Sequence, residues 1–376
     1  MIVNGQALRP VRALASRQAI EVIDQRALPH RLQVRPLANA RDVFVAIREM
    51  WVRGAPLIGA VAAYGMALQA RRDASDAALR NTASLLQQAR PTAVNLSWAV
   101  QRLLQGLLAV PPQDRADAAW AQANALAEED VAVNFAIGQH GLALLQAVAA
   151  RKPGPVNVLT HCNAGWLATV DWGTATSPLY QAHAAGLAVH VWVDETRPRN
   201  QGASLTAWEL GQAGVPHTLV ADNAGGHLMQ RGQVDLCIVG CDRVTANGDV
   251  CNKIGTYLKA LAAQDNGVPF YVAMPTSTLD MALQDGVKQI PIEERSAREV
   301  THLQGRNAAG EVVEVCVAPE GTNAANPAFD VTPARLVTGL ITEHGVVTAQ
   351  ADALRKLVAP ATKPASAPAS TPANTP

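Results

Sequence analysis

This sequence of 376 residues has few cysteines, no net charge and few long apolar runs. Each of these features argues against a class of protein. The five cysteines form an odd set without Cys-x-x-Cys spacing, so we expect neither a disulfide framework nor a structural zinc site. Lysine and arginine total 31, as do aspartate and glutamate. This balance argues against binding to nucleic acid or to a membrane surface through charge.

Segments that direct a protein into or across a membrane are also missing. No uncharged apolar run reaches the roughly 20 residues that span a bilayer. Residues 1–25 lack the continuous apolar stretch of a secretory signal. We therefore expect a soluble protein of the cytoplasm, where reducing conditions suit unpaired cysteines.

The region from about residue 40 to residue 150 has the pattern of helices. Apolar side chains recur at helical spacing among alanines in the segments 40–52, 57–72, 95–110 and 115–150. Residues 19–25, before these segments, are consistent with a small hairpin. The sequence therefore predicts a mainly helical N-terminal domain over residues 1–125, with a linking helix near 115–150.

From about residue 154 onward, short apolar runs rich in β-branched residues alternate with helical stretches. The runs show little internal alternation of polar and apolar residues, and they cover 156–160, 187–195, 217–222, 234–242 and 269–275. Such runs are typical of a parallel sheet covered by helices on both faces. No Gly-x-Gly-x-x-Gly follows any of them, so a dinucleotide is not indicated.

The predicted fold class is therefore α/β, with a Rossmann-like, parallel-sheet C-terminal domain preceded by a smaller, mainly helical N-terminal domain. We place the Rossmann-like domain at residues 126–358. Residues 359–376 contain mostly proline, alanine, serine and threonine, which cannot bury enough surface to offset the entropy of ordering. We predict that they form a disordered tail.

Three polar clusters follow predicted strands at the point where each strand ends. They are THCNAG (160–165), DETRPRNQGAS (194–204) and the segment VGCDRVTANGDVCNKIGT (239–256). Ligands of open parallel sheets bind beyond the carboxyl ends of the strands. Any one cluster is also consistent with a solvated loop, but three at one edge favour a binding site.

Two further segments have the pattern of an anion site at the start of a helix. In VRGAPLIGA (52–60), Arg53 precedes Pro56, a residue suited to a first helical turn whose free N–H groups attract phosphate. Arg90 stands in a similar place before the helix predicted from residue 95. Lys253 follows Asn252 at what reads as another helix start. Taken singly, an arginine in such a place is more often part of a surface ion pair than a ligand contact. Lys253 is equally consistent with a solvated cap and with a residue that completes the phosphate cradle.

Cys162 and Asp242 are the candidate reactive residues of these clusters. Cys162 is either a thiol activated near a helix N-terminus or a buried structural cysteine. A dyad with His161 is disfavoured, because adjacent residues of an extended strand point to opposite faces. Asp242 is a helix cap, an ion-pair partner of Arg243 or an acid–base group. In the last role it can donate a proton near neutral pH only if burial raises its pKa, so Arg243 has to point away from it.

Together these segments resemble the family of methylthioribose-1-phosphate isomerases, enzymes of methionine salvage. The resemblance runs from about residue 20 to residue 355, through VRGAPLIGAVAAYG, ARPTAVNL, THCNAGWLAT, VDETRPRNQGASLTAWEL, GCDRVTANGDVCNKIGTY, IPIEERSAREV and NPAFDVTPARLVTGLITEHGV. The wider family includes regulatory subunits of translation initiation factor 2B and ribose-1,5-bisphosphate isomerases. The resemblance implies a helical and a Rossmann-like domain, and a homodimer.

The resemblance also implies site residues. Asp242 of GCDR matches the proton donor, and Cys162 of THCNAG matches a residue that acts as base or stabilises the transition state. The positions that match substrate contacts are Arg53, Gly54, Ala55, Arg90, Gln201, Asn252 and Lys253. Cys251 departs from the alanine expected before NKIGTY, which should affect packing more than chemistry. Neither a metal nor an organic cofactor is implied.

The implied reaction converts 5-methylthio-α-D-ribose 1-phosphate into 5-methylthio-D-ribulose 1-phosphate. The anomeric phosphate locks the sugar ring, so an acid such as Asp242 must help to break the ring C–O bond. Hydrogen then passes from C2 to C1, either through an enolate with Cys162 as base or as a hydride with Cys162 stabilising the transition state. Two other functions stay open: a non-catalytic regulatory subunit, and an isomerase of ribose 1,5-bisphosphate or 5-deoxyribose 1-phosphate.

Overall fold

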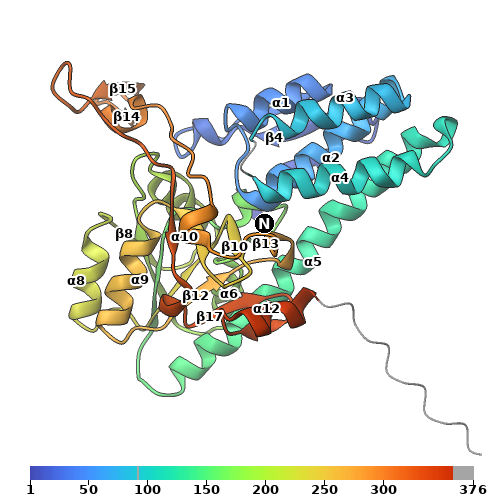
Figure 1. Cartoon of the computed structure of the whole chain (residues 1–376). Coiled ribbons are helices and arrows are strands. Elements are labelled where there is room, and N and C mark those ends of the chain that lie inside the picture. The colour runs from blue at the N-terminus through green and yellow to red at the C-terminus, as the bar shows by residue number, and fades with distance from the viewer. Residues whose placement is uncertain (91–92, 359–376) are drawn as a thin grey trace, which may run out of the picture.

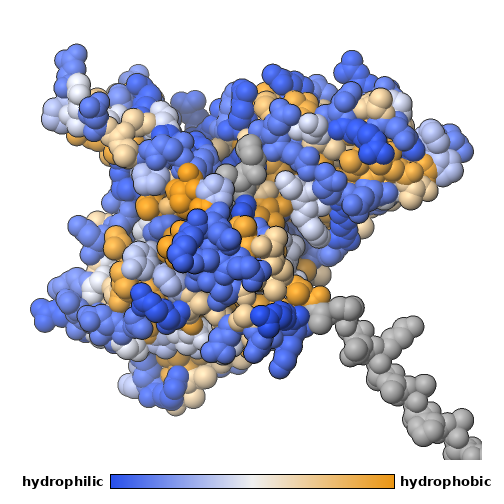
Figure 2. Space-filling view, in the orientation of Figure 1, coloured by the Kyte–Doolittle hydropathy of each residue, from blue (hydrophilic) through white to orange (hydrophobic). Residues whose placement is uncertain are grey.

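A computed structural model of the chain describes residues 1–90 and 93–358, and it has a mixed α/β architecture with one large, mostly parallel sheet (Figure 1). The α/β class predicted from the sequence is therefore confirmed. The predicted tail, residues 359–376, lies outside the described residues. On the face shown in Figure 2, hydrophilic side chains predominate and hydrophobic ones gather in small separate groups.

The first part of the chain combines short strands with a group of helices. After the β1–β2 hairpin comes an antiparallel sheet, and its middle strand is the hairpin segment predicted at 19–25. The strands are β1 (Ile2–Val3), β2 (Gln6–Ala7), β3 (Val11–Ala13), β4 (Ile20–Ile23) and β5 (Val34–Leu37). The helices are α1 (Ala40–Arg48), α2 (Ala55–Arg72), α3 (Asp76–Gln87) and α4 (Val94–Leu108). All but α3 were predicted.

Helix α2 is buried on nearly all sides, because α1, α3, α4 and the next helix, α5 (Arg115–Ala149), surround it. Its alanines and glycines allow close approach: a Cβ on Gly65 would lie 3.0 Å from the side chain of Val43. A fully apolar surface of this kind is typical of a central core helix. The packing fixes the N-terminal end of α2, which Arg53 and Gly54 directly precede.

Helix α5 connects two hydrophobic cores. Up to Ala127 its buried side chains pack with α1–α4, and from Ile137 they pack beneath the large sheet. Gly141 gives room to Pro178 of α6 (Ser177–Ala184), where a Cβ would collide. The stretch Pro112–Ala149 is also long and apolar enough to cross a membrane by length and composition alone, although we expected no such run. The alanines and glycines that allow helix packing also raise its hydropathy.

Within residues 93–358, seven strands form the large sheet in the order β18-β17-β12-β9-β6-β7-β8. All five predicted strands are present. The members are β6 (Val156–Thr160), β7 (Val189–Asp194), β8 (His217–Val220), β9 (Leu236–Val239), β12 (Phe270–Ala273), β17 (Gly339–Thr342) and β18 (Gly345–Val347). Each pair is parallel except β17–β18. Besides α5 and α6, the connecting and flanking helices are α7 (Ala207–Gln212), α8 (Ala224–Gln230), α9 (Thr256–Asp265) and α12 (Ala351–Val358).

The strand order reverses between β6 and β9, and this reversal places the site. From β6 the chain builds β7 and β8 to one side, and then returns to add β9, β12 and β17 on the other. The carboxyl ends of β6 and β9 consequently lie side by side, with the two connections leaving in opposite directions. A crevice opens at such a switch point in parallel sheets.

The polar segment 239–256 contains structure that the sequence did not reveal. Beyond Asp242 it forms the hairpin of β10 (Arg243–Thr245) and β11 (Val250–Lys253), part of a small sheet in the order β13-β10-β11-β16. The other members are β13 (Leu279–Asp280) and β16 (Phe329–Thr332). The interpretation of Asn252 and Lys253 as a helix start is thus wrong, because both residues end a strand and α9 begins at Thr256.

A second hairpin projects away from the body beside the helical region (Figure 1). It consists of β14 (His302–Arg306) and β15 (Val312–Cys316), which pair antiparallel. Two short helices precede it, α10 (Gly286–Gln289) and α11 (Arg298–Thr301). The segment between these helices lies near the crevice, since Pro291 lines a small pocket together with Asp242.

Candidate active site

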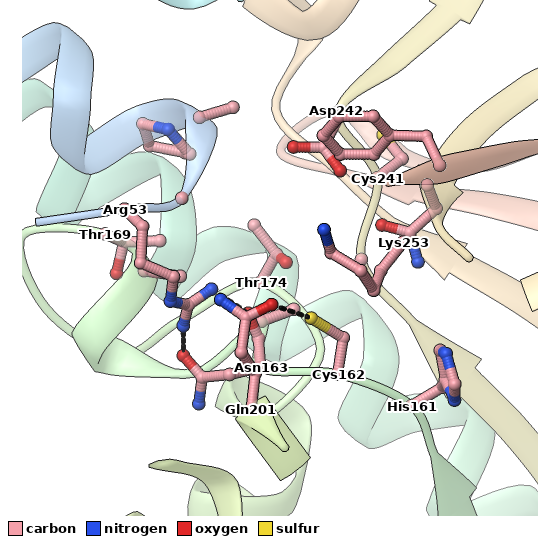
Figure 3. A pocket seen from close by; sticks show the side chains of 18 of the residues that line it. Arg53, His161, Cys162, Asn163, Thr169, Thr174, Gln201, Cys241, Asp242 and Lys253 are labelled. Carbon is pink, nitrogen blue, oxygen red and sulfur yellow. Dashed lines mark hydrogen bonds between the residues drawn. The ribbon is translucent and has the colours of Figure 1, made fainter. Parts of the chain in front are cut away.

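One pocket brings together every residue that the sequence singled out for chemistry or substrate contact (Figure 3). It lies where the carboxyl ends of β6 and β9 face the start of α2. The predicted residues that line it are Arg53, Gly54, Ala55, Arg90, Cys162, Gln201, Asp242, Asn252 and Lys253. They come from six separate places in the chain, so only the fold assembles them.

Cys162 sits just beyond β6 with a left-handed backbone, φ 65°. Hydrogen bonds fix this strained turn: its N–H donates to Thr196 Oγ1 at 2.7 Å, and its carbonyl accepts from Thr206 Oγ1 at 2.6 Å. The thiol is buried and lies 3.4 Å from the amide oxygen of Gln201. Burial raises the pKa of Cys162, while the charges of Arg53 and Lys253 oppose the shift. The neutral thiol is therefore favoured over the activated thiolate that the sequence left open.

Asp242 faces the same pocket from the end of β9. Its N–H donates to the carbonyl of Cys251 at 2.9 Å, which anchors the backbone. Burial raises the pKa of the carboxyl, and the nearby charges of Lys253, Arg90 and Arg53 act against that shift. Arg243 forms an ion pair with Asp280 at 3.4 Å, as expected if its guanidinium points away from the reactive carboxyl. The geometry suits a carboxyl that holds a proton and can release it.

Arg53 is buried at the start of α2 and is held through neutral partners. Its guanidinium donates to the carbonyl of Asn163 at 2.7 Å, to the side-chain oxygen of Asn163 and to Gln25 Oε1 at 3.2 Å. No carboxylate of the described residues forms an ion pair with it, and burial lowers its pKa. Such a fixed, uncompensated cation is suited to a phosphate.

The N-terminus of α2 lies directly beside this arginine. Gly54 has φ 97°, and a Cβ there would collide with the backbone of Ala168, so only glycine fits. No side chain caps the helix, and Pro56 occupies its first turn as predicted. The N–H groups of this turn remain available to an anion.

Lys253 is the second cation of the pocket. Its ammonium lies 4.4 Å from the centroid of the Phe329 ring, and in Figure 3 it extends between the carboxyl of Asp242 and the thiol of Cys162. Burial lowers the pKa of Lys253, and those two acidic groups oppose the shift. Asn252 beside it donates to Thr256 Oγ1 at 3.0 Å.

The start of α9 does not supply a second anion site. Asp330 accepts hydrogen bonds from the N–H groups of Gly255 at 2.7 Å and Tyr257 at 3.1 Å, so this helix start is already capped. The sequence suggestion that Lys253 completes a phosphate cradle at a helix start is therefore wrong in its geometry. The lysine reaches the pocket from a strand.

Arg90 lines the pocket, but it also forms the ion pair that the sequence left open as an alternative. Its Nη2 lies 3.3 Å from Glu293, and its buried Nε has no hydrogen-bond partner among the described residues. Glu293 pairs in turn with Arg295 at 2.8 Å. Arg90 is thus one end of a charged chain through the segment between α10 and α11.

Two residues that sequence reasoning missed support the thiol side. Glu209 of α7 is fully buried and accepts from the N–H groups of Trp166 and Leu167, at 3.1 and 2.8 Å, and from Asn163 Nδ2 at 3.1 Å. Asn163 therefore connects this carboxylate to Arg53. The available signal was a glutamate inside an apolar helical stretch, AWEL, but nothing in the sequence identified its partners.

His161 turns away from Cys162, in keeping with the alternation of strand neighbours. Its ring joins Asp194 and Asp222 in a group spaced closely enough to hold a metal ion. The ammonium of Lys259 already lies 3.2 Å from Asp194 Oδ2 and donates to the carbonyl of Asp222. An internal cation therefore occupies the position at which a metal would bind Asp194.

Known proteins resemble the chain over almost its full length. The model of the Initiation factor 2 subunit family matches residues 51–349. A methylthioribose-1-phosphate isomerase from Cereibacter sphaeroides (strain KD131 / KCTC 12085) is 59% identical over 363 residues, covering 96% of this chain and 99% of that protein.

Solved structures agree with this similarity. A crystal structure of 5-methylthioribose 1-phosphate isomerase from Pyrococcus horikoshii OT3 superposes with a TM-score of 0.81 at 40% identity, covering 94% of this chain and 96% of that chain. The translation initiation factor eIF-2B, subunit delta, from A. fulgidus gives 0.75 at 39% identity, covering 91% and 96%. The chain therefore belongs to the Initiation factor 2 subunit family and, within it, to the methylthioribose-1-phosphate isomerases.

Proposed function

We propose that this protein is an aldose–ketose isomerase of methionine salvage, which converts 5-methylthio-α-D-ribose 1-phosphate into 5-methylthio-D-ribulose 1-phosphate. One observation carries the proposal: a thiol and a carboxyl from adjacent strands, Cys162 and Asp242, face one pocket beside the cations Arg53 and Lys253. The names of the relatives at 59% and 40% identity support the same substrate.

Asp242 is the proposed proton donor for ring opening. The bond between C1 and the ring oxygen breaks, and that oxygen takes the proton of Asp242. A carboxyl can do this near neutral pH only when its pKa is raised, and burial raises the pKa of Asp242 in the pocket. Lys253 and Arg90 beside it would stabilise the carboxylate that remains.

Hydrogen must then move from C2 to C1 while the C2 hydroxyl becomes a carbonyl by giving its proton to the Asp242 carboxylate, which restores the acid. Cys162 either removes the C2 proton to give an enolate or stabilises a hydride shift. Burial raises the pKa of the Cys162 thiol, which supports the second role, because a neutral thiol is a weak base but a usable hydrogen-bond donor. Neither route consumes an oxidant or reductant, and we propose no metal or organic cofactor.

The phosphate is proposed to bind between Arg53 and Lys253. Gly54 and Ala55 would contribute backbone N–H groups at the uncapped start of α2. Arg90, Gln201 and Asn252 complete the set of proposed substrate contacts that line the pocket. Met50, Pro56, Pro275 and Phe329 supply apolar surface for the methylthio group.

We further propose a division into two domains, residues 1–125 and 126–358, of which the second is Rossmann-like. Buried side chains of α5 join one hydrophobic core up to Ala127 and another from Ile137, which supports a domain boundary inside this helix. The reversal of strand order between β6 and β9 is typical of Rossmann-like sheets. The unpaired cysteines suit the proposed cytoplasmic location.

A homodimer is the proposed assembly, without nucleic-acid or membrane partners. Only 28% of the most apolar 18-residue stretch of α5 is buried within one chain, and Phe135 is 39% exposed. Gln139 and Gln146 are exposed along the same helix, and lipid tails would leave both amides without partners. A second copy of the chain would cover this surface better than a bilayer.

Product formation from methylthioribose 1-phosphate tests the proposal. We expect the purified protein to turn over this sugar, with loss of turnover in Cys162→Ser. The matched control is Cys316→Ser, at an exposed position outside the pocket. Turnover by folded Cys162→Ser at the unmodified rate would remove the cysteine from the mechanism. Absence of turnover in the unmodified protein would favour a regulatory subunit, the class of the 39% identical relative.

The substrate labelled with deuterium at C2 separates the two routes for hydrogen. A hydride shift carries the label to C1 of the product, whereas an enolate exchanges it with solvent. Specificity constants for ribose 1,5-bisphosphate and 5-deoxyribose 1-phosphate, measured beside the methylthio sugar, check the substrate. We expect the bisphosphate to be turned over least efficiently.

A further inference from the structure

His161 directly precedes Cys162 in the chain, but its ring contacts other parts of the molecule. Its ring is completely buried and points away from Cys162 (Figure 3). Nδ1 lies 2.8 Å from Asp194 Oδ2, and Nε2 lies 2.8 Å from the carbonyl oxygen of Ile254. The ring thus connects the ends of β6 and β7 to the chain just after β11.

These two contacts fix the orientation of the ring. A carbonyl oxygen can only accept, so Nε2 donates its hydrogen to the Ile254 carbonyl. Asp194 Oδ2, the partner of Nδ1, also lies 3.2 Å from the ammonium of Lys259. The other charged groups around it are Asp330 of β16 and Asp222 before α8.

The Ile254 carbonyl belongs to the residue directly after Lys253. Gly255 follows with φ 101°, and a Cβ there would lie 2.9 Å from His161 Cε1, so the ring packs closely against this turn. Asp330 holds the other side of the turn through the N–H groups of Gly255 and Tyr257. The end of β11 is therefore held between the ring of His161 and the carboxyl group of Asp330.

We propose that His161 is a positioning residue: its buried ring, held between Asp194 and the Ile254 carbonyl, fixes the ammonium of Lys253 beside the thiol of Cys162. The tripeptide His161–Cys162–Asn163 then positions two of the cations that line the pocket, because Asn163 also holds Arg53 by two hydrogen bonds. This inference rests on the proposed roles of Cys162 and Lys253. Its readout, the reactivity of the thiol, requires no substrate and no turnover.

The test measures the rate at which iodoacetamide alkylates Cys162, followed by mass spectrometry of its peptide across pH. The charge of Lys253 favours the thiolate of Cys162. We expect His161→Gln to slow alkylation at pH 8.5 by about threefold to tenfold and to move its pH profile upward. Lys253→Met should do the same. The control is His190→Gln on β7, whose ring contacts Thr218 outside the pocket and whose loss should leave the rate unchanged.

The double variant His161→Gln/Lys253→Met distinguishes positioning from a general loss of structure. If His161 acts through Lys253, the double variant should react no more slowly than Lys253→Met alone. Fully additive effects, or an unchanged profile in folded His161→Gln, would overturn the inference. Should His161→Gln not fold, ¹⁵N spectra of histidine-labelled unmodified protein decide. A hydrogen on Nε2 of His161, which the contact with the Ile254 carbonyl requires, supports the proposal, and an Nε2 without hydrogen contradicts it.

Discussion

The two sides of the pocket are built differently. On the thiol side, formed by Cys162, Asn163 and Gln201, hydrogen bonds hold the backbone and side chains, and a fully buried carboxylate, Glu209, lies behind them. On the carboxyl side, formed by Asp242, Asn252 and Lys253, the carboxyl of Asp242 accepts no hydrogen bond from any described residue. The charges of Lys253, Arg90 and Arg53 attract its ionised form, and the charge of Glu293 repels it.

This difference matches what each side has to do. A group that stabilises a transition state works best when it is held in advance, which the buried network behind Cys162 provides. A group that gives up and regains a proton must remain accessible to the substrate, and hydrogen bonds to the protein would fix its charge state. The thiol side therefore determines the geometry of the transition state, and the carboxyl side determines the proton transfer.

Asp242→Asn should have the largest effect on activity and little effect on folding. The amide keeps the shape but cannot donate the proton, so we expect kcat to fall about 100-fold to 10 000-fold. Stability should change by less than about 1 kcal/mol, because the carboxyl makes no hydrogen bond that folding would lose. Steady-state kinetics and thermal unfolding measure the two quantities, with Asp280→Asn as the control for loss of a nearby carboxylate.

The pH dependence of turnover tests the same role of Asp242 as a proton donor. Because burial raises the pKa of Asp242, its protonated form persists to higher pH than an ordinary aspartate allows. Turnover should be retained below that raised pKa and fall as the pH rises through it. A rate that rose across this range would show that the ionised carboxylate is the active form.

Glu209→Gln should show the opposite balance, with a smaller effect on chemistry and a larger effect on folding. The glutamine amide places N–H groups against the N–H donors of Trp166 and Leu167, so we expect a loss of about 1–3 kcal/mol in the free energy of unfolding. Turnover per folded molecule should fall less than in Asp242→Asn. Urea unfolding and active-site titration check both, and a variant as stable as the unmodified protein would contradict the network.

The stability effect of Glu209 should also depend on pH. Burial raises the pKa of Glu209 to about 7 from an ordinary value of 4.5. Its stabilising contribution is therefore complete below pH 4.5 and is lost as the pH rises through 7. The difference in unfolding free energy between the unmodified protein and Glu209→Gln should consequently be larger at pH 5 than at pH 8.

Cys251→Ala should have the smallest effect. Cys251 is buried on β11 against Ile290, Ala328 and Phe329, and it holds Asp242 through its backbone carbonyl only. Replacing the side chain leaves that hydrogen bond in place, so kcat should stay within about twofold and stability within about 1 kcal/mol. A large loss of turnover would show that the carboxyl side is packed more tightly than the open geometry indicates.

Much of the site could be predicted because parallel strands deliver their last residues to one edge. Cys162, Gln201 and Asp242 each follow a predicted strand, and all three line the pocket. The hairpin of β10 and β11 could not be predicted. Its strands are short and lie among charged and amide residues, a composition that resembles a loop. Glu209 and the Ile254 carbonyl were also missed, since each acts on the site through partners distant in sequence.

The sequence by itself determined five strands of the large sheet, most of the long helices and which side chains are chemically available at the strand ends, because these depend on local periodicity and residue type. Only the tertiary structure decided the protonation of those side chains and the distances between them. Burial and neighbouring charges shift the pKa of Cys162, Asp242 and Lys253, and both arise when β6, β9, β11 and α2 meet. The sequence contains the ionisable side chains, but the electric field that acts on them exists only after folding.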